Sequence, residues 1–250
     1  MIFRLLDNKV VISAKGKNKI LNFRFANTGM LPDIFNEIFV DKVYFKDFGK
    51  GRIFSINKKD TVIDIGANVG FFSVYAANLA YQGKVYAFEP VKSSFEQLLY
   101  YKNRFKLDNL IVQNNAVSNE RKEAKIWLSA QNIGAHCFYK DKISDIEKEK
   151  AEDYEITGCI TLKDAFDHHD IKLCDFLKID VEGEEYNIIE NMPREYFDRI
   201  QKIALEYHPV PGKSVWSLAD YLNDLGFAIY IFHWNKNFGR LFAYKKQKCA

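Results

Sequence analysis

An apolar segment that runs into a glycine-containing turn carries the clearest chemical signal in this sequence. Val62 to Ile65 has the composition of a buried strand, and Gly66-Ala67-Asn68-Val69-Gly70 follows it and leads into a helical pattern. Glycine lets a backbone approach a ligand closely, and the first N–H groups of a helix are available to bind one. The turn therefore predicts a site for a nucleotide-like ligand. Asn68 replaces the middle glycine of a dinucleotide-binding G-x-G-x-x-G turn, so NAD is not expected, but Asn tolerates the left-handed backbone that the turn needs.

Polar residues also end the next two predicted strands. Glu89 follows the strand Lys84 to Phe88, at close to the ~20-residue spacing from the first glycine at which an acid meets ribose hydroxyls in such folds. Its two carboxylate oxygens can accept both hydroxyl protons. Asn115 and Ala116 follow the third strand, where an amide suits the edge of an adenine ring and a small residue leaves room for it. A turn-forming role for Asn115 stays open.

The fourth and fifth predicted strands end in charged residues. Alternation along the fourth strand places Lys178, Asp180 and Glu182 on one side, and in the fifth it places Glu206 and His208 together. Because the carboxyl ends of parallel strands form the ligand-binding edge of a sheet, these groups are expected at one site. A histidine there could take a proton from an acceptor hydroxyl, although a purely structural histidine is the alternative. The following Glu184 and Glu185 fit the start of a helix, which favours acids.

The same strand ends could instead hold a metal ion. Asp180, Glu206 and His208 are hard or borderline ligands that suit Mg²⁺ or Mn²⁺. Carboxylates on neighbouring strands more often orient a ligand directly, so no metal site is predicted from the sequence.

The elements that must position these residues alternate between strand and helix from Thr61 onward, which predicts an α/β fold with a parallel sheet covered by helices on both faces. Residues 1–60 are predicted to form a β-rich N-terminal cap with one helix from about Pro32, and residues 61–250 the main domain. Residues 119–160 break the rhythm and are treated as an insertion. Ser93 with Glu96, and Thr161 with Asp164, predict capping boxes at two helix starts.

Composition narrows the function further. The 250 residues are 48% hydrophobic and 28% charged, as in a globular protein, and the net charge is +3 without a basic stripe, which argues against a nucleic-acid partner. The 4 cysteines are far apart, which favours reduced thiols over a zinc or disulfide framework. Charged residues interrupt the first apolar stretch, and no apolar run approaches the ~18 residues of a membrane span, so we expect a cytoplasmic protein.

Taken together, the motifs resemble one family, the S-adenosylmethionine-dependent methyltransferases of the FkbM type, within the class I methyltransferases. The resemblance runs from Glu37 to Phe242 and rests on five short motifs in order: the DIGANVG turn at 64–70, FEP at 88–90, NAVS at 115–118, KIDVEGEE at 178–185 and EYH at 206–208.

The resemblance implies a Rossmann-like seven-stranded sheet with an antiparallel last strand. It also implies that S-adenosylmethionine is held by the glycine turn, the acid and the amide segment, so the expected cofactor-binding residues are Asp64, Gly66, Ala67, Asn68, Gly70, Phe72, Glu89, Pro90, Asn115, Ala116 and Asp180. Acceptors would be hydroxyl groups of small molecules, secondary metabolites or glycans. Residues 129–139 would cover the acceptor pocket.

The expected reaction is in-line displacement, in which an acceptor oxygen attacks the sulfonium methyl group. Positioning supplies most of the acceleration, and a base adds to it. His208 is the first candidate for that base, and Asp180 and Glu206 are the other expected catalytic residues. Two alternatives remain open at this point: an RNA methyltransferase, and a non-catalytic protein that binds the donor.

Overall fold

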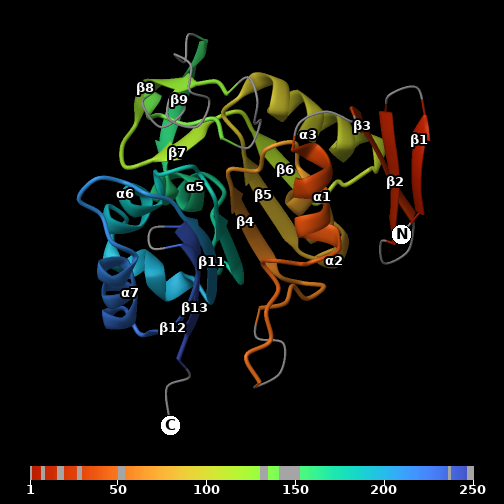
Figure 1. Cartoon of the computed structure of the whole chain (residues 1–250). Helices are drawn as coiled ribbons and strands as arrows, with labels where there is room; N and C mark the ends of the chain where they lie inside the picture. Colours follow the sequence, from red (N-terminus) through yellow and green to blue (C-terminus); the bar gives the residue numbers. More distant parts are fainter. Residues whose placement is uncertain are drawn as a thin grey trace.

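A seven-stranded sheet forms the centre of the computed structural model, which describes residues 2–6, 9–15, 20–26, 30–49, 54–129, 135–140, 153–235 and 238–246 (Figure 1). Its order is β12-β13-β11-β10-β4-β5-β6. The strands are β4 (Thr61–Ile65), β5 (Lys84–Phe88), β6 (Leu110–Gln113), β10 (Phe176–Ile179), β11 (Lys202–Tyr207), β12 (Phe227–Asn235) and β13 (Phe238–Lys245). β13 runs antiparallel to both of its neighbours, β11 and β12, and all other strand pairs of this sheet are parallel. The expected sheet with an antiparallel last strand is therefore confirmed.

Alternation along the strands divides the core into two layers. Val62 packs with one set of buried residues, while the next residue, Ile63, packs with the other. The first layer is covered by α1 (Leu31–Phe39), α2 (Phe71–Leu79) and α3 (Lys92–Arg104), and the second by α5 (Leu162–His168), α6 (Glu185–Glu190) and α7 (Val215–Asp224). A 3₁₀ helix, η1 (Arg194–Arg199), packs on the second layer. The near-continuous apolar strands are explained by this burial on both faces.

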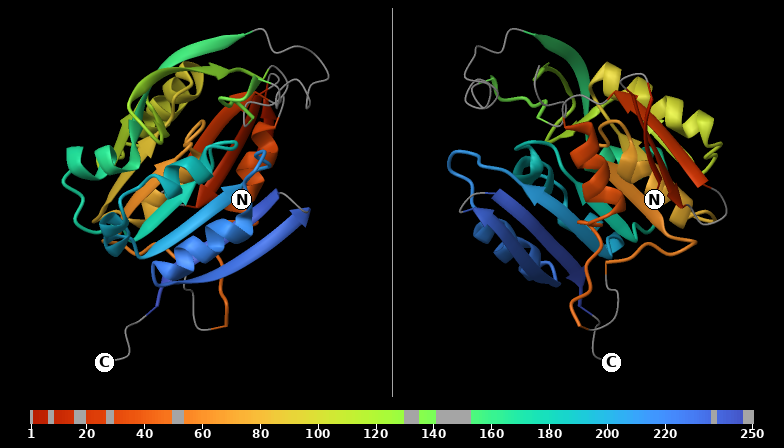
Figure 2. Two further views of the ribbon diagram at one scale, coloured as in Figure 1. Left: turned by 90° about the vertical axis from the view of Figure 1, so that its left-hand side faces the viewer. Right: turned by 45° about the vertical axis from the view of Figure 1, so that its right-hand side comes forward.

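The N-terminal cap contains a second sheet. It consists of β1 (Ile2–Leu6), β2 (Lys9–Lys15) and β3 (Ile20–Ala26), all antiparallel, and it lies beside α3 (Figure 2). The fully buried ring of Phe23 in β3 lies 5.4 Å from Phe35, 5.4 Å from Phe71 and 5.1 Å from Tyr101, measured between ring centroids. The cap and the central sheet therefore share one core.

The predicted insertion builds a third sheet. Its strands are β7 (Ala116–Ser118), β8 (Lys122–Trp127) and β9 (Tyr154–Thr161), in the order β7-β9-β8. Residues 130–134 and 141–152 of the insertion lie outside the described part of the chain. The segment 135–140 is attached to this sheet by a bridge between Trp127 and Cys137.

Helix starts were predicted with mixed success. Thr161 and Asp164 form the expected capping box of α5. The box predicted for Ser93 and Glu96 is wrong, because α3 begins after Val91 and has no side-chain cap. No helix in the described ranges is long and apolar enough to cross a membrane.

Shortening Phe23 tests whether the cap and the sheet unfold together. Phe23→Ala should lower the free energy of unfolding by about 3–5 kcal/mol, because it removes a fully buried ring from a core that both parts share. Chemical denaturation followed by circular dichroism should show one shifted transition. Arg24→Ala, which alters an exposed neighbour in the same strand, should stay within about 0.5 kcal/mol of the parent. An unchanged main transition in Phe23→Ala would show that the cap folds separately.

Candidate functional site

A pocket of about 420 Å³ lies at the carboxyl ends of the central strands, in the size range of about 300–1,000 Å³ that is typical of small-molecule sites. Its floor comes from the turns after β4, β5 and β10. Its walls come from α1 and Tyr44 of the N-terminal cap, from the segment 135–140, and from Trp234 and Phe238 of the last hairpin. The site thus combines segments from most of the chain.

The glycine turn has the backbone that its sequence predicts. Gly66 has φ +77°, and a Cβ added there would lie 1.7 Å from the carbonyl oxygen of Asp180, so no side chain fits. Asn68 has φ +51°, the left-handed conformation that Asn accepts. Gly70, with φ +90°, begins α2 and packs against Leu98. The turn is therefore held close to β10 and leaves backbone atoms facing the pocket.

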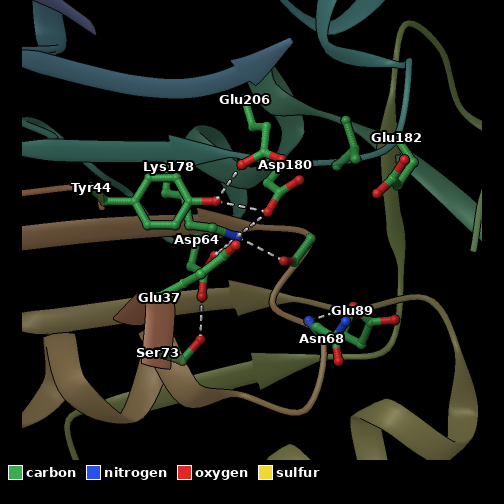
Figure 3. A network of polar contacts seen from close by, with 12 residues as sticks. Glu37, Tyr44, Asp64, Asn68, Ser73, Glu89, Lys178, Asp180, Glu182 and Glu206 are labelled. Atoms are coloured by element: carbon green, nitrogen blue, oxygen red, sulfur yellow. Dashed lines mark hydrogen bonds and ion pairs between the residues drawn. The ribbon is translucent and has the colours of Figure 1, made fainter. Parts of the chain in front are cut away.

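Glu89 ties the glycine turn to the end of β5. Its side chain accepts hydrogen bonds from the N–H of Asn68 at 2.7 Å and from that of Val91 at 2.9 Å. Burial raises the pKa of Glu89 to about 7, although these two hydrogen bonds act in the opposite direction. Each carboxylate oxygen can accept a further hydrogen bond. Glu89 therefore holds the turn through its hydrogen bond to Asn68 (Figure 3). It can also accept hydrogen bonds from the hydroxyl groups of a ligand.

Lys178 lies under the turn and is 4% exposed. Its ammonium group donates to the carbonyl oxygen of Gly66 at 2.8 Å and lies 3.1 Å from the Asp64 carboxylate. Burial opposes ionisation of Lys178, but the carboxylates of Asp64 and Asp180 outweigh it and raise the pKa of the lysine. Asp64 also accepts a hydrogen bond from Ser73 in α2. Asp64, an expected donor-binding residue, therefore lies beneath the pocket, where it positions Lys178.

Asp180 and Glu206 face the pocket beside Tyr44 of the cap. The Tyr44 hydroxyl donates to Asp180 at 2.8 Å and lies 3.4 Å from Glu206, which is paired with Arg240 at 2.9 Å (Figure 3). Burial opposes ionisation of Asp180, but Lys178 and His208 outweigh it, so its pKa is lowered. Burial and the neighbouring Asp180 raise the pKa of Glu206 to about 8. At this one site, therefore, the pKa of Asp180 is lowered and the pKa of Glu206 is raised, so that Asp180 loses its proton more readily than Glu206.

His208 is held between three carboxyl groups. Its Nδ1 lies 2.7 Å from Glu185 Oε1, and its Nε2 lies 3.3 Å from Glu182 Oε2 and 3.8 Å from Glu206 Oε1. A carboxylate can only accept a hydrogen bond, so Glu185 favours the tautomer with the proton on Nδ1. With Glu185 accepting from Nδ1, the other ring nitrogen, Nε2, faces the carboxyl groups of Glu182 and Glu206.

Glu184 and Glu185, which follow β10, start α6 as predicted, and both also make buried contacts that were not predicted. Glu185 is fully buried and also accepts hydrogen bonds from the N–H groups of Val181 and Gly183, each at 3.2 Å. Glu184 is 4% exposed and accepts hydrogen bonds from the hydroxyls of Ser118, at 2.6 Å, and Tyr139, at 3.1 Å. These two carboxylates therefore fix the loop after β10 and the segment 135–140, which lines the pocket.

The expected site residues fall into three groups. Those that line the pocket are Gly66, Ala67, Asn68, Phe72, Glu89, Pro90, Ala116, Asp180 and Glu206. Asp64, Gly70 and His208 lie behind this lining and contact or support it. The Asn115 side chain lines a second groove and donates to the carbonyl oxygen of Gly158 at 3.3 Å, so its place in a base-binding edge stays a proposal.

Several site residues were not predicted from the sequence. Tyr44, Glu37 and Arg240 come from segments far from the motifs, and nothing in their local sequence marks them. Lys178, by contrast, was expected at this edge with Asp180 and Glu182, and as a charged residue within the apolar strand FLKI it needs the buried partner that Asp64 supplies.

The sequence matches the family model described as the methyltransferase FkbM domain over residues 64–229. It is 25% identical over 226 residues to the 31-O-demethyl-FK506 methyltransferase FkbM of Streptomyces tacrolimicus, a match that covers 81% of this chain and 84% of that protein. A match of 26% identity to the AMB antimetabolite synthetase AmbE of Pseudomonas aeruginosa covers 77% of this chain, which spans only 10% of that protein.

The fold also resembles a solved structure. The crystal structure of methyltransferase FkbM from Methylobacillus flagellatus superimposes with a TM-score of 0.51 at 13% sequence identity. The match covers 79% of this chain and 46% of that one, and it shows a shared fold.

Removing the Lys178 charge should destabilise the protein strongly. Lys178→Met leaves the buried Asp64 carboxylate without its cation, so the free energy of unfolding should fall by about 3–5 kcal/mol. Urea unfolding of the variant measures this loss. The double variant Lys178→Met with Asp64→Asn should recover part of it, since the buried charge is gone. A double variant no more stable than the single one would contradict this role of the ion pair.

Proposed function

The chain belongs to the FkbM methyltransferase family, and on that basis we propose that it transfers the methyl group of S-adenosylmethionine to a hydroxyl group of a small molecule or glycan. The observation that carries the proposal is the pocket itself, in which a glycine turn and a buried acid adjoin a cluster of carboxyl groups and a histidine. One end suits a nucleoside, and the other can receive a proton.

The donor end of the pocket fits an adenosyl sulfonium. The Gly66 backbone leaves space that a Cβ would fill, and Glu89 has acceptor capacity for the ribose hydroxyls. Ala116 and Pro90 line the region proposed for the base. The sulfonium carries a positive charge, which the ionised Asp180 carboxylate favours. Asp180 is therefore proposed both to attract the donor and to orient its methionine part.

The acceptor end lies between Tyr44, Glu206 and the aromatic pair Trp234 and Phe238. An acceptor oxygen held there attacks the methyl carbon as the carbon–sulfur bond breaks, and the sulfur leaves as a neutral thioether with the bonding electrons. The hydroxyl proton passes to Glu206 or to His208 Nε2, which lie 3.8 Å apart. Holding oxygen, carbon and sulfur in line supplies most of the acceleration.

Two observations favour a hydroxyl acceptor of modest size. The name of the relative from Streptomyces tacrolimicus describes methylation of an oxygen on FK506, a reaction stated for that protein. In this chain, His136 and Phe138 of the segment 135–140 close over the pocket, which suits an enclosed acceptor. An RNA acceptor is not favoured, because the net charge is only +3.

Donor binding should depend on pH through Glu89. The carboxylate must be ionised to accept the ribose hydroxyls, and its pKa is about 7 in the ligand-free protein. Affinity for S-adenosylhomocysteine should therefore rise about tenfold between pH 6 and pH 8, whereas the ligand-free protein loses stability as Glu89 ionises. Calorimetry across this range measures the affinity. Glu89→Gln should bind more weakly and without this pH dependence; a parent protein with flat affinity would argue against ribose binding by Glu89.

Methyl transfer itself can be tested with a panel of hydroxyl compounds and donor carrying a labelled methyl group. Product analysis by NMR should place the label on oxygen. Glu206→Gln or His208→Ala should lower kcat by about 10²–10⁴-fold while leaving the affinity for S-adenosylhomocysteine within about threefold of the parent. Equal losses of turnover and affinity would make these residues binding groups. Absence of donor binding in the folded parent protein would overturn the proposed function.

A further inference from the structure

We propose that Asp180, Glu182 and His208 bind a divalent cation at the acceptor end of the pocket. Each residue offers one ligand atom, and the three atoms lie within 4.8 Å of one another. Two ligands on opposite sides of a cation at about 2.4 Å are separated by about 4.8 Å, so the three atoms can share one ion with small side-chain adjustments. This inference rests on the proposed function and adds a component that the sequence did not predict.

The surroundings of His208 match those of a metal-bound histidine. Metal-ligating histidines typically donate their second ring N–H to a carboxylate, which fixes the tautomer and leaves the other nitrogen to the ion. Glu185 supplies that carboxylate at 2.7 Å from Nδ1. Glu185 is fully buried, and its Oε2 has no hydrogen-bond partner among the described residues. A buried carboxylate with an unsatisfied oxygen is costly unless positive charge lies close by.

The charged side chains around Asp180, Glu182 and His208 are mostly acidic, which favours binding of a cation. Carboxyl groups that lie at or beside His208 are those of Asp180, Glu182, Glu185 and Glu206. The basic side chains that face this group are Lys178, which also neutralises Asp64, and Arg240, which also lies 3.5 Å from Glu37. Glu206 is mostly protonated below its pKa of about 8, but the carboxylates of Asp64, Asp180, Glu182 and Glu185 still outnumber these two basic groups, and a divalent ion would balance them.

The donor set indicates which cations fit. Two carboxylate oxygens and one imidazole nitrogen, without a thiolate, suit Mn²⁺ or a similar ion of intermediate hardness. Three protein ligands leave positions for the acceptor oxygen or for water. The ion would hold the acceptor hydroxyl and lower its pKa, which assigns His208 to the ion and the proton to Glu206.

Glu182 separates this proposal from the simpler mechanism. If His208 acts only as a base and Asp180 only orients the donor, Glu182 has no part in either step. If a cation is bound, Glu182 is one of its ligands, and its loss weakens the ion directly.

Titration of chelator-treated, tag-free full-length protein with Mn²⁺, followed by the EPR signal of the free ion, tests the site. One ion per chain is expected. Glu182→Gln should weaken binding at least tenfold, and Glu185→Gln, which acts through His208, by about 10–100-fold. Glu37→Gln is the matched control, because it removes a carboxylate that lines the same pocket but is outside the ligand set. It should leave Mn²⁺ affinity within about threefold.

Pulsed EPR of the parent complex provides a readout that needs no variant. Coupling from a directly bound imidazole nitrogen is expected from His208, and its absence would overturn the proposal. So would an equal loss of Mn²⁺ affinity in Glu182→Gln and Glu37→Gln, which would indicate a general attraction to negative charge. Binding of S-adenosylhomocysteine in the presence of chelator is measured in parallel. Retained donor binding without Mn²⁺ binding would reject the cation and leave the proposed function intact.

Discussion

The ammonium group of Lys178 is buried at the carboxyl ends of the strands. It contacts the Asp64 carboxylate, the Gly66 carbonyl oxygen and, at 3.7 Å, the Asp180 carboxylate. These contacts join the ends of β4 and β10 and set the height of the glycine turn above them. The buried ammonium group can hold these strand ends together only while its carboxylate partners are present, because an unpaired buried charge lowers the free energy of unfolding. The position of the turn depends on this lysine, which together with His208 also keeps the pKa of Asp180 low.

Around this lysine, the pocket is organised as two ends with different electrostatics. At one end, Glu89 is bonded to backbone N–H groups and borders apolar residues. At the other, several carboxyl groups gather near a single histidine, and Tyr44 and Arg240 from opposite termini of the chain complete the enclosure. Under the proposed function, a cationic donor would bind with its positive charge close to these carboxyl groups.

Much of the architecture could be predicted from the sequence, because the strands around Val62, Val85 and Leu177 are strongly apolar and end in residues that stop a strand. The backbone of the glycine turn could be predicted as well, since Gly66 and Asn68 lie in a short local motif. The contacts of Tyr44 and Arg240 could not, because they depend on how distant segments pack. The helix start predicted at Glu184 and Glu185 is confirmed, but the burial of Glu185 against His208 could not be predicted, because it too depends on the packing of distant segments.

The pocket draws on two parts of the chain. The glycine turn, Glu89, Asp180 and Glu206 lie within the stretch 64–229 that matches the family model, whereas Glu37, Tyr44, Trp234 and Arg240 lie outside it. Under the proposed function, substitutions in α1 or in the final hairpin would change which acceptor is methylated while leaving the glycine turn and Glu89 intact. One catalytic frame could then diversify toward new products through its terminal segments.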